Sequence, residues 1–278
     1  MSRVEKVLSH LNRSGKGLEI GPSHRPMAPK SKGFNVDVMD VAGQEALRAK
    51  LQDKAHINVA NIEPVDYVWK GEHYVDITGK PKHYDWVIAS HVIEHAPDLI
   101  GFINDCDAIL NDNGYLSLVV PDKRFCFDHF RPVSGLGKVI DSHLNKNTMH
   151  TPGTVAEYYL NVVAKNKLIA WGQDHRGDYN LVHGLGKAVN SMKQAGDHSA
   201  YLDVHCWCFV PSAFRLIIDD LNALGLVKMK EVGFFNTEGC EFYITLGRTG
   251  QGSGIPRLDL LKSIATESCD GEAAIQSS

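Results

Sequence analysis

Residues 84–95 read YDWVIASHVIEH, and this stretch decides the fold that we expect. Its first seven residues are almost continuously apolar, which is typical of a strand covered on both faces of a sheet. Residues 99–110 follow with apolar side chains at helical spacing, and residues 115–120 form a second β-prone run. A strand, a helix and a second strand in this order predict two parallel strands joined by a crossover helix.

The same alternation is present upstream of this stretch. Residues 17–21 and 33–38 are short apolar runs, and the second of these strands is predicted to end in Asp37. A helical pattern follows at residues 42–51, and a third apolar run occupies residues 65–69. The N-terminal half therefore predicts a parallel sheet covered by helices.

The C-terminal part departs from this alternation. A helix is expected at residues 212–224, followed by β-like segments at residues 227–235 and 241–247. The connection between those two segments is too short for a parallel crossover, so the last strand is predicted to run antiparallel to its neighbour. The predicted fold class is α/β: a Rossmann-like, doubly wound and mostly parallel sheet with an antiparallel last strand.

Residues 126–205 break the β/α alternation and are predicted to form a helical lid inserted before the final helix and hairpin. The α/β core then comprises residues 1–125 and 206–248, and residues 249–278 are expected to form a flexible tail. Within the lid, a Thr-Pro pair is typical of the start of a helix, which we expect at residues 151–171. Aromatic residues are concentrated in the lid, which suits a planar or carbohydrate ligand and equally suits packing of the lid itself.

The composition excludes several classes of protein. Of the 278 residues, 43% are hydrophobic and 22% are charged, a mixture typical of a folded globular chain. The net charge is −4 and no basic block is present, so nucleic acid is not an expected partner. No apolar stretch approaches the roughly 18 residues of a membrane span. We therefore expect a cytoplasmic protein without a transmembrane segment, whose scattered cysteines are free thiols.

The turn after the first predicted strand is the first candidate site. Ligands of doubly wound sheets bind beyond the carboxyl ends of the strands, where a glycine such as Gly21 lets the backbone approach closely. Pro22 interrupts the glycine pattern that would cradle a pyrophosphate. Asp37 offers a carboxylate to both hydroxyls of a ribose. A cofactor with a ribose but no pyrophosphate fits these features, although a glycine and an acid at strand ends are common elsewhere.

Several motifs follow one another in an informative order. Residues 19–21, Asp37, residues 84–95 and residues 113–115 resemble the successive motifs of class I S-adenosylmethionine-dependent methyltransferases. The resemblance covers most of the predicted core and implies S-adenosylmethionine as the cofactor. It implies a binding set in which Glu19, Gly21 and the adjoining Pro22 flank the methionine part, Asp37 holds the ribose, Trp69 and Glu72 lie by the adenine, and Ser90 and His91 lie near the sulfonium. The usual further glycine of the first loop is missing, so the first helix is expected to be short or absent.

Three strings resemble a narrower bacterial branch of that superfamily. They are EIGPSHRP at residues 19–26, ASHVIEH at residues 89–95 and VPDKRFCFDHFRP at residues 120–132. This branch is often associated with surface-polysaccharide or glycosyl-transfer systems. The resemblance implies a function in glycan biosynthesis and makes a sugar hydroxyl the leading acceptor.

Residues 91–95, HVIEH, also match the inverted signature of zinc proteases. Pro97 follows too closely for one helix to carry the whole motif, so we do not favour a protease. A similar string in ubiquinone-pathway O-methyltransferases is a magnesium site, but His91 replaces its first glutamate and magnesium prefers oxygen ligands. We favour Glu94 and His95 as residues that cap the helix and order the loop, and we expect no metal ion.

Charged residues are concentrated after the fifth predicted strand. Their position at the carboxyl edge suits contacts to a polar or anionic acceptor, and arginine is suited to bidentate contacts. A solvated rim of ordinary ion pairs is the competing interpretation. The candidate acceptor-binding residues are Asp122, Lys123, Arg124, Asp128 and Arg131.

The expected reaction is methyl transfer by in-line displacement to a sugar or another small polar acceptor. The protein must align nucleophile, methyl group and sulfur, and remove a proton when the nucleophile is a hydroxyl. We expect His91 to act as the general base because it is predicted to lie nearest the methyl group and to titrate near neutrality, with His95 in reserve. A non-catalytic protein that binds the cofactor is the main alternative. A nicotinamide-dependent oxidoreductase is the third, disfavoured by the broken glycine pattern.

Overall fold

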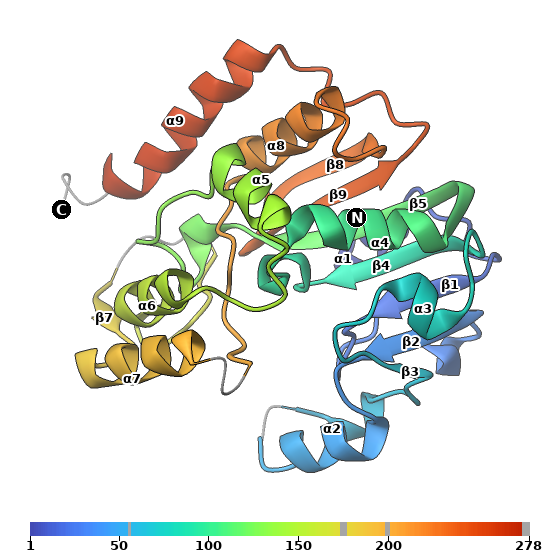
Figure 1. The fold of residues 1–278 in the computed structure, drawn as a ribbon, viewed down its shortest axis with the longest axis horizontal. Coiled ribbons are helices and arrows are strands. Elements are labelled where there is room, and N and C mark those ends of the chain that lie inside the picture. The colour runs from blue at the N-terminus through green and yellow to red at the C-terminus, as the bar shows by residue number, and fades with distance from the viewer. Residues whose placement is uncertain (55–56, 173–176, 198–200, 274–278) are drawn as a thin grey trace.

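A computed structural model describes residues 1–54, 57–172, 177–197 and 201–273 of the chain. Its main sheet has seven strands in the order β3-β2-β1-β4-β5-β9-β8, with the last two strands encoded by the C-terminal part (Figure 1). The strands of this sheet are β1 (Gly17–Ile20), β2 (Val36–Asp40), β3 (Tyr67–Val68), β4 (Tyr84–Ser90), β5 (Leu110–Pro121), β8 (Lys230–Glu238) and β9 (Glu241–Gly247).

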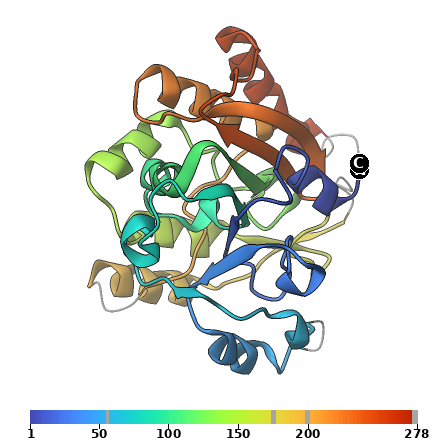
Figure 2. The same ribbon diagram turned by 90° about the vertical axis from the view of Figure 1, so that its right-hand side faces the viewer.

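Helices connect and cover these strands. A 3₁₀ turn, η3 (Ile93–His95), follows β4 directly, and another, η4 (Lys123–Phe125), follows β5. The α-helices of the core are α1 (Arg3–Val7), α2 (Gln44–Leu51), α3 (Tyr74–Thr78), α4 (Leu99–Ile109) and α8 (Pro211–Ala223). Figure 2 shows the C-terminal helix (red) and the region of α2 (blue) at opposite ends of the molecule.

The strand directions confirm the predicted fold class. β1 pairs in parallel with β2 and with β4, and β4 pairs in parallel with β5. β9 runs antiparallel to both β5 and β8, as the short connection between the last two strands predicts. The result is a Rossmann-like sheet with helices on its faces.

β4 is buried on both faces, as its unbroken apolar sequence predicts. Val87 and Ala89 belong to the larger hydrophobic cluster, together with the apolar side chains of α4. Trp86 and Ile88 alternate with them and belong to a second cluster, which includes apolar side chains of α1. The indole of Trp86 lies against Gly17, where an added Cβ would come within 2.1 Å of the ring, so only glycine fits at the start of β1.

The insertion is less helical than the sequence predicts. It contains α5 (Leu136–Leu144), α6 (Pro152–Asn161) and α7 (Leu185–Gly196), and Thr151 caps α6 as expected. Two short antiparallel strands, β6 (Val163–Lys165) and β7 (Tyr179–Leu181), occupy part of the remainder. The prediction that the helix starting at Thr151 continues to residue 171 is therefore wrong, because the chain turns into β6 after Asn161.

The segment expected to be a flexible tail contains a helix, α9 (Arg257–Ala273), whereas residues 274–278 lie outside the described residues. Leu260 on this helix is 1% exposed. The carboxylate of Glu267 accepts hydrogen bonds from the backbone N–H and the hydroxyl of Ser212, at the start of α8. α9 therefore packs on the core and is held there by polar contacts.

The carboxyl ends of the parallel strands face the insertion. In Figure 1 the arrow of β4 points toward the side of the molecule where α6 and α7 lie. No helix within the described ranges is long and apolar enough to span a membrane. The geometry thus places the inserted segment beside the edge where ligands of such sheets bind.

Candidate active site

The turn after β1 is shaped by a glycine and a buried glutamate. Gly21 has a φ of +63°, a conformation that L-residues with a side chain rarely adopt, and its N–H donates to the carbonyl of Met39 at 2.8 Å. Glu19 is 2% exposed, and its carboxylate accepts the backbone N–H groups of Met27 at 2.6 Å and Ala28 at 3.1 Å. Glu19 therefore holds the loop that replaces the first helix.

The pKa of Glu19 reflects this burial. Removal of the carboxyl group from water raises its pKa to about 7, although the two backbone hydrogen bonds act in the opposite direction. The resemblance implies that Glu19 flanks the methionine part of the cofactor. The geometry supports an indirect function instead, because both carboxylate oxygens are bound to the loop.

Asp37 does not end the second strand, so this part of the sequence prediction is wrong. β2 continues to Asp40, and Asp37 lies level with Leu18, two residues before the end of β1. Its carboxylate accepts hydrogen bonds from Lys16 and Lys80, which precede β1 and β4. Burial raises the pKa of Asp37, but these ammonium groups outweigh it and hold the pKa near 2. The side chain belongs to the amino side of the sheet, away from the expected ribose.

Asp40 occupies the position that the sequence prediction gave to Asp37. It is 6% exposed and lies at the carboxyl end of β2. Its carboxylate accepts the backbone N–H groups of Ser23 at 3.2 Å and Val41 at 2.7 Å, and its carbonyl accepts the N–H of Trp69 at 2.9 Å. One residue thus joins the loops that follow β1, β2 and β3. Burial raises the pKa of its carboxyl group.

Trp69 and Glu72 form a closed turn after β3. The indole N–H of Trp69 donates to the carbonyl of Glu72 at 2.8 Å, and the ring packs edge-on against Tyr74. The Glu72 carboxylate accepts the backbone N–H of Lys70 at 2.8 Å. This turn lies next to Asp40 through the backbone hydrogen bond of Trp69, and its position beside the adenine stays a prediction.

The end of β4 carries a network of charged and polar side chains. The hydroxyl of Ser90 accepts a hydrogen bond from Arg3 at 2.9 Å, and Arg3 also forms a bidentate pair with Glu241, at the start of β9. His91 has a φ of +55°, and its Nε2 lies 2.7 Å from the Glu241 carboxylate. Its Nδ1 lies 3.4 Å from Glu94. Both ring nitrogens of His91 therefore face carboxylates of the chain.

The pKa of His91 differs from the sequence prediction. Burial lowers the pKa, but the hydrogen bond to Glu241 and the charge of Glu94 outweigh burial and raise it to about 9. This pKa lies above the near-neutral value expected from the sequence, and the action of His91 as a general base stays a prediction. The complementary effect holds the pKa of Glu241 near 2 despite its burial, because His91 and Arg3 stabilise the carboxylate.

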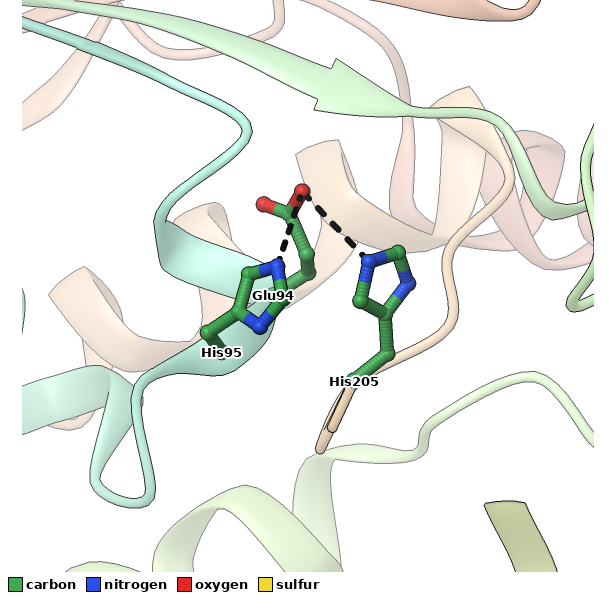
Figure 3. A group of neighbouring side chains, drawn as sticks. All are labelled: Glu94, His95 and His205. Atoms are coloured by element: carbon green, nitrogen blue, oxygen red, sulfur yellow. Dashed lines mark ion pairs between the residues drawn. The ribbon is translucent and has the colours of Figure 1, made fainter. Parts of the chain in front are cut away.

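A second group of polar side chains lies beside His91. Glu94 is fully buried within η3, His95 ends that turn, and His205 comes from the extended segment before α8 (Figure 3). The Oε1 atom of Glu94 lies 4.0 Å from Nε2 of His95 and 3.9 Å from Nε2 of His205. The outer nitrogen of His95 pairs with Asp203 at 2.8 Å. Burial lowers the pKa of His95, but Asp203 and Glu94 outweigh it and raise the pKa.

The charged residues after β5 are mostly buried. Arg124 pairs with Asp122 through two nitrogens, and the ammonium of Lys123 donates to the carbonyl of His129 at 2.6 Å. Asp128 and Arg131 are each 1% exposed and pair at 2.7 Å. The expectation of a charged edge that grips an acceptor stays a prediction, and the geometry gives these side chains partners within the chain.

Sequence reasoning missed several residues of this site. Asp40 was missed because the second strand was assigned three residues too early. The signal for His205 is weak, since 109 residues separate it from His95 and no local motif links them. Glu241 and Arg3 come from the two parts of the chain farthest apart in sequence. The antiparallel position of β9 beside β5 brings Glu241 to His91, and α1 brings Arg3 to Ser90 and Glu241.

A separate pocket of about 680 Å³ lies at the opposite side of the sheet, near the amino ends of the central strands. It is lined by residues 9–12, Asp85 and residues 111–113, which lie near the amino ends of β4 and β5. The residues that we expect to bind the cofactor lie at or near the carboxyl ends, apart from Asp37. We therefore do not connect this pocket with the candidate active site.

The fold and the site define a Rossmann-like enzyme with a ligand edge formed by the ends of β1, β2 and β4. The sequence profile of a family described as "Methyltransferase domain" matches residues 1–178, more than half of the chain. The chain belongs to this family. It is an S-adenosylmethionine-dependent methyltransferase of class I, as the order of its motifs predicts.

Solved structures of methyltransferases are similar to this chain at low sequence identity. A structure of the trans-methyltransferase CalH in complex with SAH is 15% identical, with a TM-score of 0.40, over 84% of this chain and 51% of CalH. The chain thus spans about half the length of CalH. A S-adenosylmethionine-dependent methyltransferase from Methanosarcina mazei is 12% identical, with a TM-score of 0.44, over 90% of this chain and 99% of that one.

A third similar structure is the CcbJ methyltransferase from Streptomyces caelestis. It is 11% identical, with a TM-score of 0.43, over 89% of this chain and 96% of CcbJ. No curated protein sequence matches the chain. The assignment to the family therefore depends on the profile match and on the strand order of the sheet.

Proposed function

We propose that this methyltransferase transfers a methyl group to a hydroxyl of a sugar or another small polar acceptor. The observation that carries the proposal is the group of buried polar side chains at the end of β4. There the imidazole of His91 lies within ion-pair distance of both Glu94 and Glu241, beside the turn that would hold the cofactor. A site so rich in charges suits an acceptor with several hydroxyl groups.

The residues at the strand ends fit S-adenosylmethionine. The positive φ of Gly21 and the absence of its side chain let the β1 turn approach a ligand closely, and an added Cβ would meet Val92 at 3.0 Å. We assign the ribose hydroxyls to Asp40 in place of Asp37, since its two oxygens have lone pairs beyond the two backbone bonds that they accept. Trp69 and Glu72 would then adjoin the adenine.

Ser90 and His91 would lie by the sulfonium, because Ser90 ends β4, His91 follows it and the next residue, Val92, adjoins the β1 turn at Gly21. When bound, the cofactor supplies an electrophilic methyl group, and the chain aligns the acceptor with it. Both nitrogens of His91 are engaged with carboxylates. This geometry supports His91 as a residue that fixes the polar face of the site, and argues against its action as a free general base.

Aromatic side chains in the inserted segment support a sugar as the acceptor. Tyr179 stacks on His129 at 5.0 Å, and Trp171 packs edge-on against the same pair. Aromatic rings of this kind suit the apolar face of a sugar ring, and we propose a role for the inserted segment, residues 126–205, in acceptor choice. A function in surface-glycan biosynthesis is the most specific form of this proposal.

Calorimetry with S-adenosylmethionine and with its demethylated product tests the cofactor assignment directly. We expect saturable binding of both, with a dissociation constant well below millimolar. Methyl transfer is then measured with labelled cofactor across a panel of free sugars, nucleotide sugars and non-carbohydrate alcohols. Absence of binding at millimolar concentration would overturn the site. Turnover confined to acceptors without a sugar would overturn the acceptor class alone.

A further inference from the structure

The group formed by Glu94, His95 and His205 has the donor set of a metal centre (Figure 3). One carboxylate oxygen and one nitrogen from each imidazole lie within 4.8 Å of one another. A tetrahedral ion with bonds of about 2.0–2.1 Å holds its ligand atoms about 3.4 Å apart. The separations of 3.9 and 4.0 Å from Glu94 to the two imidazoles require only small inward movements.

The burial of Glu94 is the strongest single observation. Its side chain is 0% exposed, and neither oxygen accepts a hydrogen bond from any residue that the structure describes. A buried carboxylate without hydrogen bonds is costly, so its charge needs a compensating partner. The histidines around it contribute ion pairs at 3.4 Å and beyond. A cation between Glu94 and the two imidazoles satisfies this carboxylate directly.

Each imidazole is also oriented as in a metal site. Nδ1 of His205 forms a hydrogen bond of 2.5 Å with the carboxylate of Asp128, whereas Nδ1 of His95 lies 2.8 Å from that of Asp203, at ion-pair distance but without hydrogen-bond geometry. Histidine ligands usually donate their second N–H to a carboxylate, which fixes the tautomer and the ring orientation. Here both carboxylates occupy the Nδ1 side, so both Nε2 atoms are left facing Glu94.

The backbone holds these side chains in place before any ion binds. The N–H groups of Cys206 and Trp207 both donate to the carbonyl of Glu94, at 2.7 and 3.2 Å. The indole of Trp207 donates to the carbonyl of Ala96 at 2.7 Å. The segment that carries His205 is therefore bonded on both sides of His95, and the three candidate ligands are preorganised.

We propose that Glu94, His95 and His205 bind a divalent transition-metal ion of the Zn²⁺ class. Two nitrogen donors and one oxygen donor suit this class, whereas Mg²⁺ and Ca²⁺ prefer oxygen ligands. Three protein ligands leave at least one coordination position open. The site differs from the inverted protease signature, because His91 is bound to Glu241 and the third ligand comes from a distant segment.

Binding of the ion does not depend on the proposed acceptor. An ion at this position would lie beside the end of β4, and a metal ion can lower the pKa of a bound hydroxyl group. That consequence rests on the proposed function, whereas metal binding is measured without cofactor or acceptor. Calorimetry with the cofactor therefore tests the proposed function, and titration with the metal ion tests the metal site. A negative result in one leaves the other proposal standing.

The test uses the full chain without a histidine tag, stripped with a chelator and then titrated with Zn²⁺ by calorimetry. A parallel titration with Co²⁺ follows visible absorption. We expect one equivalent of saturable binding, at least 100-fold tighter for Zn²⁺ than for Mg²⁺. Glu94→Gln and His95→Ala should each weaken binding at least tenfold, and Asp203→Asn should weaken it about tenfold through His95.

His73→Ala is the matched control, because His73 pairs with Asp105 at 2.8 Å outside the cluster. Its zinc affinity should equal that of the wild type. Circular dichroism checks that each variant is folded. If Glu94→Gln does not fold, Asp203→Asn still tests the site, because the Asp203 side chain is 69% exposed and its substitution should not disturb the core. Absence of saturable zinc uptake by the folded wild type, or unchanged affinity in the folded His95 and Asp203 variants, overturns the proposal.

Discussion

The backbone N–H of Cys206 donates to the carbonyl oxygen of Glu94 at 2.7 Å, and this bond joins the end of the insertion to the loop after β4. It places His205 beside η3 although more than a hundred residues separate the two segments. The insertion therefore returns to the sheet at the candidate active site rather than at a remote surface. Changes to this connection should affect both stability and the polar cluster.

Trp207→Phe tests that connection. The substitution keeps most of the apolar ring but removes the indole N–H that donates to Ala96, and leaves that carbonyl without its partner. Because Trp207 is 1% exposed, water cannot replace the bond, and we expect a loss of about 1–3 kcal/mol in the free energy of unfolding. Urea denaturation measures this loss. Trp69→Phe is the control, because its indole hydrogen bond to Glu72 is exposed and its loss should reduce the unfolding free energy less. Equal losses in the two variants would contradict a special contribution of the buried bond.

Asp40→Ala and Asp37→Ala separate the two candidate ribose contacts. We expect Asp40→Ala to weaken binding of S-adenosylmethionine at least tenfold, because the carboxylate lies at the carboxyl end of β2. Asp37→Ala should leave the dissociation constant unchanged, since its carboxylate is bound to lysines on the amino side. Calorimetry on both folded variants gives the comparison. The reverse pattern of affinities would restore Asp37 as the ribose contact.

The order of strands and helices was predictable because it depends on local patterns. The continuous apolar run of β4 and the helical spacing of α4 follow from which side chains must be buried. The length of β2 was not predictable from the same pattern. Gly33 to Val38 looked like a complete strand, but pairing with β1 starts only at Val36 and extends to the end of β1 opposite Met39. Tertiary pairing therefore moved the proposed ribose contact by three residues, from Asp37 to Asp40.

The candidate site was less predictable than the fold. Gly21 and His91 were found because they directly follow apolar strands. The effect of Glu241 on His91 could not be anticipated, because it depends on β9 lying beside β5. The charged run after β5 indicated a binding surface, yet Asp128 turns inward to His205. Sequence spacing shows which residues are available, whereas burial and pairing decide their chemistry.

The buried pair of Arg131 and Asp128 should make a large contribution to stability. Both side chains are almost inaccessible to solvent, and Arg131 also donates to Glu157 at 3.1 Å. Arg131→Leu leaves the Asp128 charge without this partner, so we expect a loss of about 3–5 kcal/mol in the free energy of unfolding. Arg257→Leu is the matched control, because its pair with Asp220 is 60% exposed on the arginine side and its loss should destabilise the fold much less. Similar losses in the two variants would contradict a structural function for the buried pair.

Glu19 predicts a specific dependence of stability on pH. Its pKa is raised to about 7 in the folded protein and is near the ordinary glutamate value of 4.5 in the unfolded chain, so the folded state keeps the proton to a higher pH. Between these two values the unfolded state releases a proton that the folded state keeps, and stability falls as the pH rises. Glu19→Gln removes this titration. Between pH 5 and pH 8, the variant should gain on the order of 2 kcal/mol in unfolding free energy relative to the wild type.

Denaturant titrations of the wild type and Glu19→Gln at several pH values across that range measure the difference directly. Only its change with pH is informative, because the glutamine amide offers Met27 and Ala28 one acceptor oxygen where the carboxylate offers two. That lost acceptor shifts the whole curve of the variant by a constant amount. A difference in unfolding free energy that stays flat from pH 5 to pH 8 would show that Glu19 is already ionised in the folded protein.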